Sequence, residues 1–185
     1  VALARAESEL GVIPHDAATE IAAKAQLDLL DRARIDEGLR RTAHPLVPLV
    51  WELSRICTGD AGRYVHWGAT TQNIVQTGDL LILRRAHAIF LRQIAAILRD
   101  MADLAERSRD MALPGRTHGQ HAVPATFGFK VGVWIDEYCR HCERLRGVES
   151  RIFRAMLGGA AGTFASFDAK GPAIQARMAA HLNMA

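Results

Sequence analysis

Three short polar segments interrupt otherwise apolar stretches of the sequence, and each of them could carry chemistry. The first contains His44, the second spans residues 66–73, and the third spans residues 116–121. The third places a guanidinium, a hydroxyl, an amide and two imidazoles beside a glycine, which lets a ligand approach the backbone closely. Because imidazole transfers protons near neutral pH, this segment is a candidate for acid–base catalysis, although a merely hydrogen-bonded loop has the same composition equally often.

The segment 66–73 leads into a long predicted helix that begins at Thr70 or Thr71. The first N–H groups of a helix have no partner within it, the helix dipole is positive there, and two hydroxyls stand beside them. Such an arrangement binds carboxylates. The competing interpretation is that the threonines only cap the helix, and without further observations the sequence favours capping.

Other titratable and metal-binding residue types give weaker signals. Lys130 lies at the apolar start of a predicted helix, where it either extends to solvent or holds an anion, and the preceding histidines favour the anion. Cys139 and Cys142 supply only half of a zinc site and the sequence has no second pair, so buried structural thiols are expected and no metal is predicted. Three further histidines are expected at the surface, namely His15, His87 and His181.

Helical periodicity dominates the sequence, and no alternating segment is long enough for a sheet, so the predicted fold class is all-α. The segment 113–124 cannot be helical, because two prolines and two glycines bracket it. We expect two domains, an N-terminal helical domain (1–70) and the first part of a central long-helix bundle (71–185). The predicted helices cover residues 1–10, a stretch that begins at 14, a stretch that ends near 44, and residues 45–57, 71–110, 125–154 and 172–184.

The predicted helix 71–110 carries two adjoining apolar seams with alternating spacings of three and four residues. One seam runs from Phe90 to Leu104 and the other from Leu91 to Ala105. At ~1.5 Å per residue the helix is about 55–60 Å long, which exceeds the width of a globule of this size. Because two seams need at least two neighbouring helices, the sequence predicts a homo-oligomer.

Length and composition exclude several classes of protein. The chain has 185 residues, 49% of them hydrophobic, and a formal net charge of +3, which favours an ordinary core-forming chain over a nucleic-acid binder. No apolar run approaches the ~20 residues of a membrane span, and three cysteines without a leader indicate a reducing cytoplasm. Because the sequence begins with Val1, apparently within a helix, we expect it to be part of a longer protein.

Two longer blocks carry a family resemblance: YVHWGATTQN at residues 64–73 and GRTHGQHAVPATFGFK at residues 115–130. They resemble two of the three active-site blocks of the fumarase/aspartase superfamily, and within it the branch of adenylosuccinate lyase and 3-carboxy-cis,cis-muconate cycloisomerase. The segments 41–47 and 158–167 also resemble that branch, so the resemblance covers nearly the whole chain.

The resemblance implies a homotetramer in which each active site is assembled from blocks of three subunits. It also implies addition or elimination beside a carboxylate of a small dicarboxylate substrate, with no cofactor: a base removes a proton from the adjacent carbon, and an acid protonates the leaving nitrogen or oxygen. Matching of the blocks makes His118 the candidate general acid, with His66 and His44 as supporting histidines. The implied substrate-binding residues are Thr70, Thr71, Asn73, Arg116, Thr117, Gln120 and Lys130.

The sequence departs from the family pattern in several places. Asn73 stands where the family usually has Asp, and Gln76 stands where it often has Asp, so two charges are lost and the substrate is left open. His118 favours elimination, since cycloisomerases often carry Trp there, whereas residues 66–68 and 158–162 resemble the cycloisomerases more closely. The two lost charges also favour an alternative from another class, a helical scaffold without chemistry.

The third family block, which carries the serine base, does not occur within the 185 residues. The resemblance therefore places the catalytic base beyond Ala185. On this expectation the 185-residue chain alone is inactive.

Overall fold

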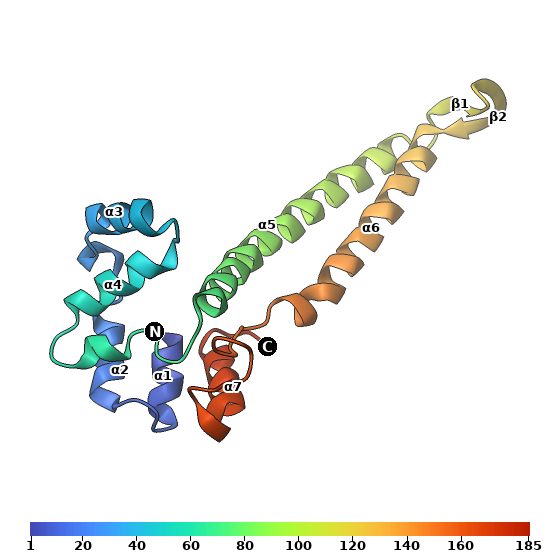
Figure 1. The fold of residues 1–185 in the computed structure, drawn as a ribbon. Helices are drawn as coiled ribbons and strands as arrows, with labels where there is room; N and C mark the ends of the chain where they lie inside the picture. The colour runs from blue at the N-terminus through green and yellow to red at the C-terminus, as the bar shows by residue number, and fades with distance from the viewer. The chain divides into compact units, whose positions relative to one another are not determined.

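The computed structural model describes all 185 residues and consists of seven α-helices, three short 3-10 helices and one two-stranded sheet (Figure 1). The 3-10 helices are Leu27–Leu29, Ala61–Tyr64 and Asp168–Lys170. The other elements, in chain order, are α1 (Ala2–Glu9), α2 (His15–Lys24), α3 (Arg32–Thr42), α4 (Leu46–Ile56), α5 (Thr71–Arg107), β1 (Ala112–Thr117), β2 (Gln120–Thr126), α6 (Phe127–Ile152) and α7 (Gly171–His181).

The predicted all-α class is confirmed, and the predicted helices agree with the observed ones to within a few residues. The expectation that no sheet forms is wrong at one place, because β1 and β2 pair as an antiparallel hairpin. Pro114 and Pro124 stand opposite each other in this hairpin, and a bulge follows Gly115. Prolines and bulges are unusual between hydrogen-bonded strands, and a bulge also shifts the alternation of apolar and polar residues that marks a strand in a sequence. The hairpin therefore could not be recognised from that alternation.

Contacts within the chain form two compact units. The first consists of Val1–Leu81 and Phe153–Ala185, and the second consists of Ile82–Ile152. The C-terminal segment 153–185 therefore belongs to the same unit as the N-terminal helices. The domain division expected at residue 70 stays a prediction.

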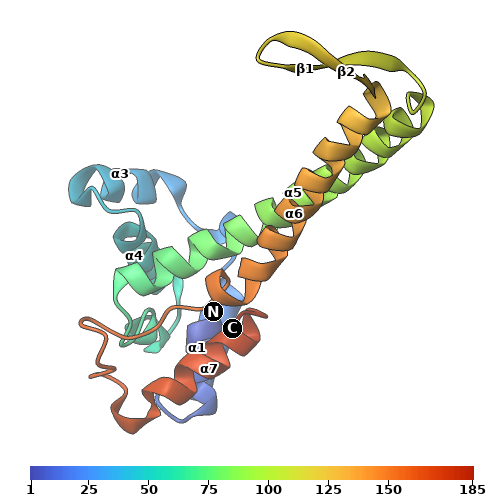
Figure 2. The ribbon, with the colours of Figure 1, turned by 90° about the vertical axis from the view of Figure 1, so that its right-hand side faces the viewer.

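The core of the first unit is built around α1 and α7, which lie side by side (Figure 2). Leu3 and Ala6 of α1 pack with Ile174 and Met178 of α7 and with Phe167 of the preceding loop, and all five are at most 7% exposed. A second cluster on the other side of α1 joins it to α2 through Ala4, Ile13, Ala18 and Ile21. The first cluster also includes Ala155 and Leu157, so it holds the loop 153–170 against α1.

The turn at Gly68 fits closely against this core. Gly68 has a φ of +62°, and a Cβ placed on it would lie 2.5 Å from the ring of Phe167, which is 2% exposed. We therefore expect Gly68→Ala to lower the free energy of unfolding by about 2–4 kcal/mol, from left-handed backbone strain and overpacking together. Urea unfolding of the natural full-length protein measures the loss.

Gly59→Ala is the matched control for this prediction. Gly59 also has a positive φ of +56°, but a Cβ there would meet no atom within 4 Å. It should lose only about 1 kcal/mol, the cost of the left-handed backbone. Equal losses at Gly59 and Gly68 would contradict the close packing of Phe167 on the turn.

The second unit contains the continuation of α5, the hairpin and α6. The two helices lie side by side in both views (Figures 1 and 2). His87 of α5 joins them: its Nε2 lies 3.0 Å from the carbonyl oxygen of Leu145, and its Nδ1 lies 3.7 Å from a carboxylate oxygen of Glu149. The surface location expected for His87 is wrong, because α6 covers this position and leaves it 9% exposed.

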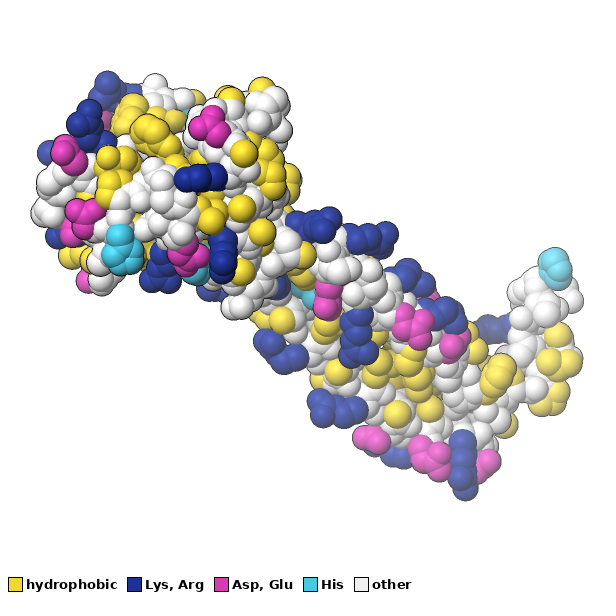
Figure 3. Space-filling model, turned by 90° about the horizontal axis from the view of Figure 1, so that it is seen from below, with side chains coloured by type: hydrophobic (Ala, Val, Ile, Leu, Met, Phe, Trp, Pro, Cys, Tyr) yellow, Lys and Arg dark blue, Asp and Glu magenta, His cyan; other side chains and the backbone are white.

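Large apolar side chains remain exposed in the second unit. They lie between basic side chains along α5 and α6 (Figure 3). Cys139 is exposed as well, so the expectation that it is buried is wrong. Val131 is the one hydrophobic side chain of this unit that is fully buried. None of the helices has the length and hydrophobicity needed to cross a membrane. The most exposed apolar side chains include Ile82 (66%), Phe90 (60%), Val123 (65%), Phe129 (70%) and Val133 (53%).

Candidate active site

His44 is held in the tight turn between α3 and α4. Ala43 ends α3 in the left-handed conformation, and the ring Nδ1 of His44 accepts a hydrogen bond from the backbone N–H of Leu46 at 3.2 Å. Because Nδ1 acts as an acceptor, the proton of the neutral ring resides on Nε2, which can donate. The structure thus leaves the Nε2 of His44 available as a hydrogen-bond donor.

The two helices that carry this turn are fixed to each other by a buried carboxylate. Glu52 of α4 is 3% exposed, forms two hydrogen bonds with Arg55 at 2.7 and 2.8 Å, and accepts a third from the backbone N–H of Asp31 at the start of α3. The Arg55 guanidinium lowers the pKa of Glu52 to about 2. The carboxylate is therefore ionised at all physiological pH values, and it keeps the His44 turn in place.

His66 lies just before α5, in a left-handed conformation with a φ of +64°. Its Nδ1 is buried without a hydrogen-bond partner. The ring borders an apolar cavity of about 200 Å³ whose other walls include Leu46, Leu53 and Ile74. Burial lowers the pKa of His66, so the imidazole is neutral at pH 7 and offers a hydrogen bond rather than a charge.

The start of α5 leaves backbone N–H groups without partners in the helix. Thr71 is the first helical residue, and the side chain of Asn73 accepts from the backbone N–H of Thr70 at 3.3 Å, as the third residue does in a capping box. The next N–H groups, those of Thr71 and Gln72, belong to the first turn and have no carbonyl partner in the helix. The hydroxyls of Thr70 and Thr71 stand beside these donors, and both residues are half-buried.

His118 occupies the tip of the β-hairpin. Thr117 pairs with Gln120, so the loop contains only His118 and Gly119, and their φ angles are +50° and +76°. Two positive φ angles in a two-residue loop are the mark of a type I′ turn, which suits the twist of the strands, and histidine is among the few non-glycine residues that tolerate this conformation. The turn presents the imidazole outward, in an exposed position.

The other predicted residues of the third segment lie around this tip. Arg116 and Thr117 end β1, Gln120 begins β2, and all three are exposed. Lys130 lies on the first turn of α6, where its Nζ is 5.6 Å from the centre of the Trp134 ring. A cation over an aromatic face is held electrostatically. Lys130 is exposed, and the ring of Trp134, one turn further along α6, holds its ammonium group.

The predicted site residues divide between the two units. The first unit holds His44 and the segment from His66 to Asn73, and the second holds the hairpin residues and Lys130. Sequence reasoning missed that Thr77 and the glycine-rich loop 156–164 belong beside the start of α5. There Thr77 binds Met156, and Asn73 binds Gly158 and Gly159. Two features of the sequence could have indicated this contact. Thr77 lies about one helical turn after Asn73, and the glycines of residues 158–162 match no phosphate-binding motif and so lacked an explanation.

Comparison with known proteins identifies the family of this chain. A family model described as "Lyase" matches residues 1–185. The chain is 42% identical to an N-acetyl-S-(2-succino)cysteine lyase of Enterococcus italicus, over 99% of this chain and 40% of the relative. It is 41% identical to an adenylosuccinate lyase of Methanothermobacter thermautotrophicus, over 99% of this chain and 41% of that relative.

A solved structure supports the same relationship. The β-carboxy-cis,cis-muconate cycloisomerase of Acinetobacter calcoaceticus superposes with a TM-score of 0.91 at 34% identity, over 99% of this chain and 44% of that one. The chain thus spans about two fifths of the length of the relatives that it matches. The family model and the identities together establish that this chain belongs to the lyase family of the fumarase/aspartase superfamily, in the branch of adenylosuccinate lyase and carboxymuconate cycloisomerase.

Proposed function

We propose that the natural protein is a lyase that eliminates an unsaturated dicarboxylate from a substrate in which a succinyl group is bonded to a heteroatom. The observation that carries this proposal is the imidazole at the hairpin tip, because its position corresponds to the general acid expected from the family resemblance. Two relatives are lyases by name, and one of them names a succinyl thioether. We therefore include sulfur among the leaving atoms.

In the proposed mechanism, a base outside these 185 residues removes the proton from the carbon next to a carboxylate. Negative charge then develops on that carboxylate, and preorganised donors stabilise it. Residues at the start of α5 offer such donors, namely the hydroxyls of Thr70 and Thr71 and the first-turn N–H groups. His44 and the neutral His66 would each add a hydrogen bond, and no cofactor takes part.

His118 would protonate the leaving heteroatom as its bond to carbon breaks. An imidazolium is suited to this step, since an acid that titrates near neutral pH transfers protons efficiently at that pH. The remaining carboxylate of the substrate would be held by cations and donors of the second unit. We assign this binding role to Arg116, Thr117, Gln120 and Lys130.

We further propose that several copies of the chain form the active site together, as a homotetramer. Support comes from the exposed apolar side chains along α5 and α6, which would lose contact with water if helices of other copies packed against them. The free cysteines Cys57, Cys139 and Cys142 support a cytoplasmic location.

The purified natural full-length protein tests the proposed function. It would be assayed with an S-(2-succino)cysteine derivative, with adenylosuccinate and with a carboxymuconate, and the absorbance of fumarate and of muconate would be followed. We expect fumarate to appear from at least one succinyl-bearing substrate. Loss of muconate absorbance alone would contradict the lyase and support a cycloisomerase, and no turnover at all would support the scaffold.

A further inference from the structure

We propose that Asn73 is a positioning residue, which acts with Thr77 to fasten the glycine-rich loop 156–164 onto the first turns of α5, next to the candidate carboxylate-binding donors. The inference rests on the proposed function, because it concerns the order of that site. It also reinterprets Asn73, which the sequence predicts to contact the substrate. All the residues involved belong to the first unit.

The side-chain oxygen of Asn73 is the centre of the attachment. This single atom accepts from the backbone N–H groups of Gly158 at 3.3 Å and Gly159 at 3.1 Å, as well as from Thr70 at 3.3 Å. The glycines follow Asn73 by 85 and 86 residues, so the contacts join distant parts of the chain. Three N–H groups converging on one acceptor fix the loop and the helix cap relative to each other.

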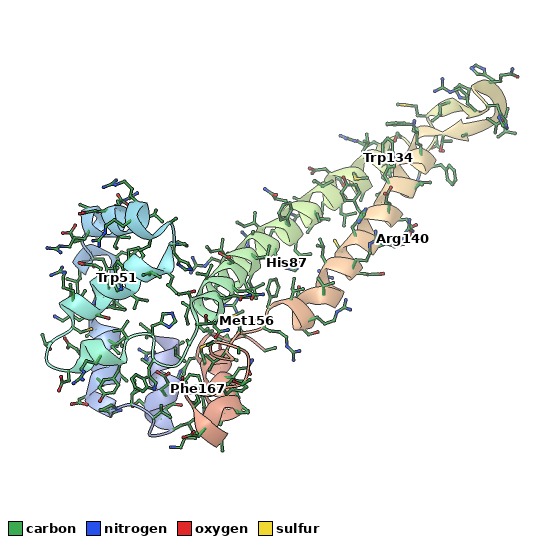
Figure 4. All side chains as sticks on the ribbon, in the orientation of Figure 1. Trp51, His87, Trp134, Arg140, Met156 and Phe167 are labelled. Carbon is green, nitrogen blue, oxygen red and sulfur yellow. The ribbon has the colours of Figure 1, made fainter.

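Thr77 makes a second attachment one helical turn further along α5. It is 5% exposed, its hydroxyl accepts from the backbone N–H of Met156 at 2.9 Å, and it lies 2.7 Å from the carbonyl oxygen of Asn73, to which it donates. A buried hydroxyl with both donor and acceptor satisfied holds its partners firmly. Figure 4 labels Met156, with which this loop begins, and Phe167, which follows it in the chain.

The glycines explain how the loop can approach so closely. Gly159 has a φ of +74°, and a Cβ placed on it would lie 3.2 Å from the carbonyl oxygen of Gly68 in the turn before α5. The loop closes on itself through a 2.8 Å hydrogen bond from the Phe164 N–H to the Gly158 carbonyl. Residues 158 and 159 are buried, whereas residues 160–163 are exposed. The attached part of the loop therefore packs directly on the segment that leads to Thr70.

The geometry separates two roles that Asn73 could have. The attachment uses only its oxygen, which accepts from three N–H groups. Contact with a substrate carboxylate would instead use its NH₂ group, because carboxylate oxygens only accept hydrogen bonds. An aspartate at this position keeps the acceptor and loses the donor. It should also be tolerated at the first turn of a helix, where the dipole favours a negative charge.

Four single variants of the natural full-length protein test the proposal: Asn73→Asp, Asn73→Leu, Thr77→Ser and Thr77→Val. We expect Asn73→Leu and Thr77→Val to lower kcat/KM about 10–100-fold, because a shift of about 1 Å at a site can cost this much. Asn73→Asp and Thr77→Ser preserve the acceptors and should recover most of the rate. Thr77 is buried, so a rate loss in Thr77→Val cannot come from lost substrate contact.

Amide hydrogen exchange gives a readout that needs no turnover. The amides of Met156, Gly158 and Gly159 should exchange faster in the Leu and Val variants than in their conservative partners, while the melting temperature and oligomeric state stay those of a folded protein. Unchanged exchange at Gly158 and Gly159 in Asn73→Leu would overturn the attachment. Equal rate losses in Asn73→Asp and Asn73→Leu, with the glycine amides still protected in Asn73→Asp, would instead assign Asn73 to substrate contact.

Failure of the proposed function has a different signature. If the unmodified protein shows no elimination, the proposed function fails, and with it the catalytic purpose of the attachment. The exchange measurement still decides whether Asn73 and Thr77 hold the loop.

Discussion

Replacing His118 with Asn lowers the turnover of the natural full-length protein about 10²–10⁴-fold, the usual contribution of a general acid. Asparagine cannot protonate a leaving group, but it tolerates the left-handed backbone that His118 adopts, with a φ of +50°. The hairpin should therefore keep its turn, and the loss should be chemical. Steady-state assays on the active succinyl-bearing substrate give the turnover, and size-exclusion chromatography checks the oligomer.

His121→Asn is the matched control, since His121 is exposed on β2 of the same hairpin and lies opposite Arg116. It should keep most of the turnover. If His118→Asn is as active as the unmodified protein, the hairpin tip is not the acid and the proposed mechanism is wrong. If both variants lose activity equally, the hairpin contributes shape rather than a specific proton donor.

Replacing Glu7 with Gln raises the free energy of unfolding at pH 7 by about 3 kcal/mol. Glu7 lies on α1 with no exposed surface, and neither of its carboxylate oxygens has a hydrogen-bond partner. Burial raises the pKa of Glu7 from 4.5 to about 8, so the folded state binds this proton more tightly than the unfolded state. The 3 kcal/mol is the cost of that shift between pH 4.5 and pH 7, at about 1.4 kcal/mol per pH unit.

The sign of the pH dependence follows from the same shift. The free energy of unfolding contributed by Glu7 is highest below about pH 4.5, falls as the pH rises, and becomes constant above about pH 8. Urea unfolding at pH 5 and pH 8 should show this fall in the natural protein and a smaller one in Glu7→Gln. Glu37→Gln, at an exposed glutamate of α3, is the control and should change little. A loss of stability in Glu7→Gln at pH 8 would mean that a cation pairs with the carboxylate.

The sequence predicts those features of the fold that depend on local pattern. The helix 71–107 could be predicted because it lacks proline and keeps helical spacing, and its start because threonines precede that spacing. Burial of Glu7 and His87 could not be predicted, because their neighbours in sequence are typical of an exposed helix face. His87 is covered by α6, which returns after the hairpin, and Glu7 lies on α1, which packs against both α2 and α7.

For the candidate site as well, the sequence predicted the local features but not the contacts between distant segments. Residue types at the start of α5 and around residue 118 indicate anion binding and proton transfer, and the family resemblance assigns their roles. The hairpin was not predicted, because its turn residues are not the Asn-Gly or Gly-Gly pairs that signal one. The role of Asn73 was not predicted either, since its partners Gly158 and Gly159 lie 85 and 86 residues away and are bound through backbone atoms, which leave no trace in residue type.

The scarcity of buried apolar side chains in residues 82–152 has a consequence for the proposed activity. A two-stranded hairpin is barely stable by itself in water, and here it carries the proposed proton donor. If other copies supply the missing neighbours, the ordering of His118 is coupled by mass action to subunit association. Catalytic power would then be a property of protein concentration: dilute solutions would contain folded N-terminal helices but few competent acid groups, and the specific activity would fall with dilution.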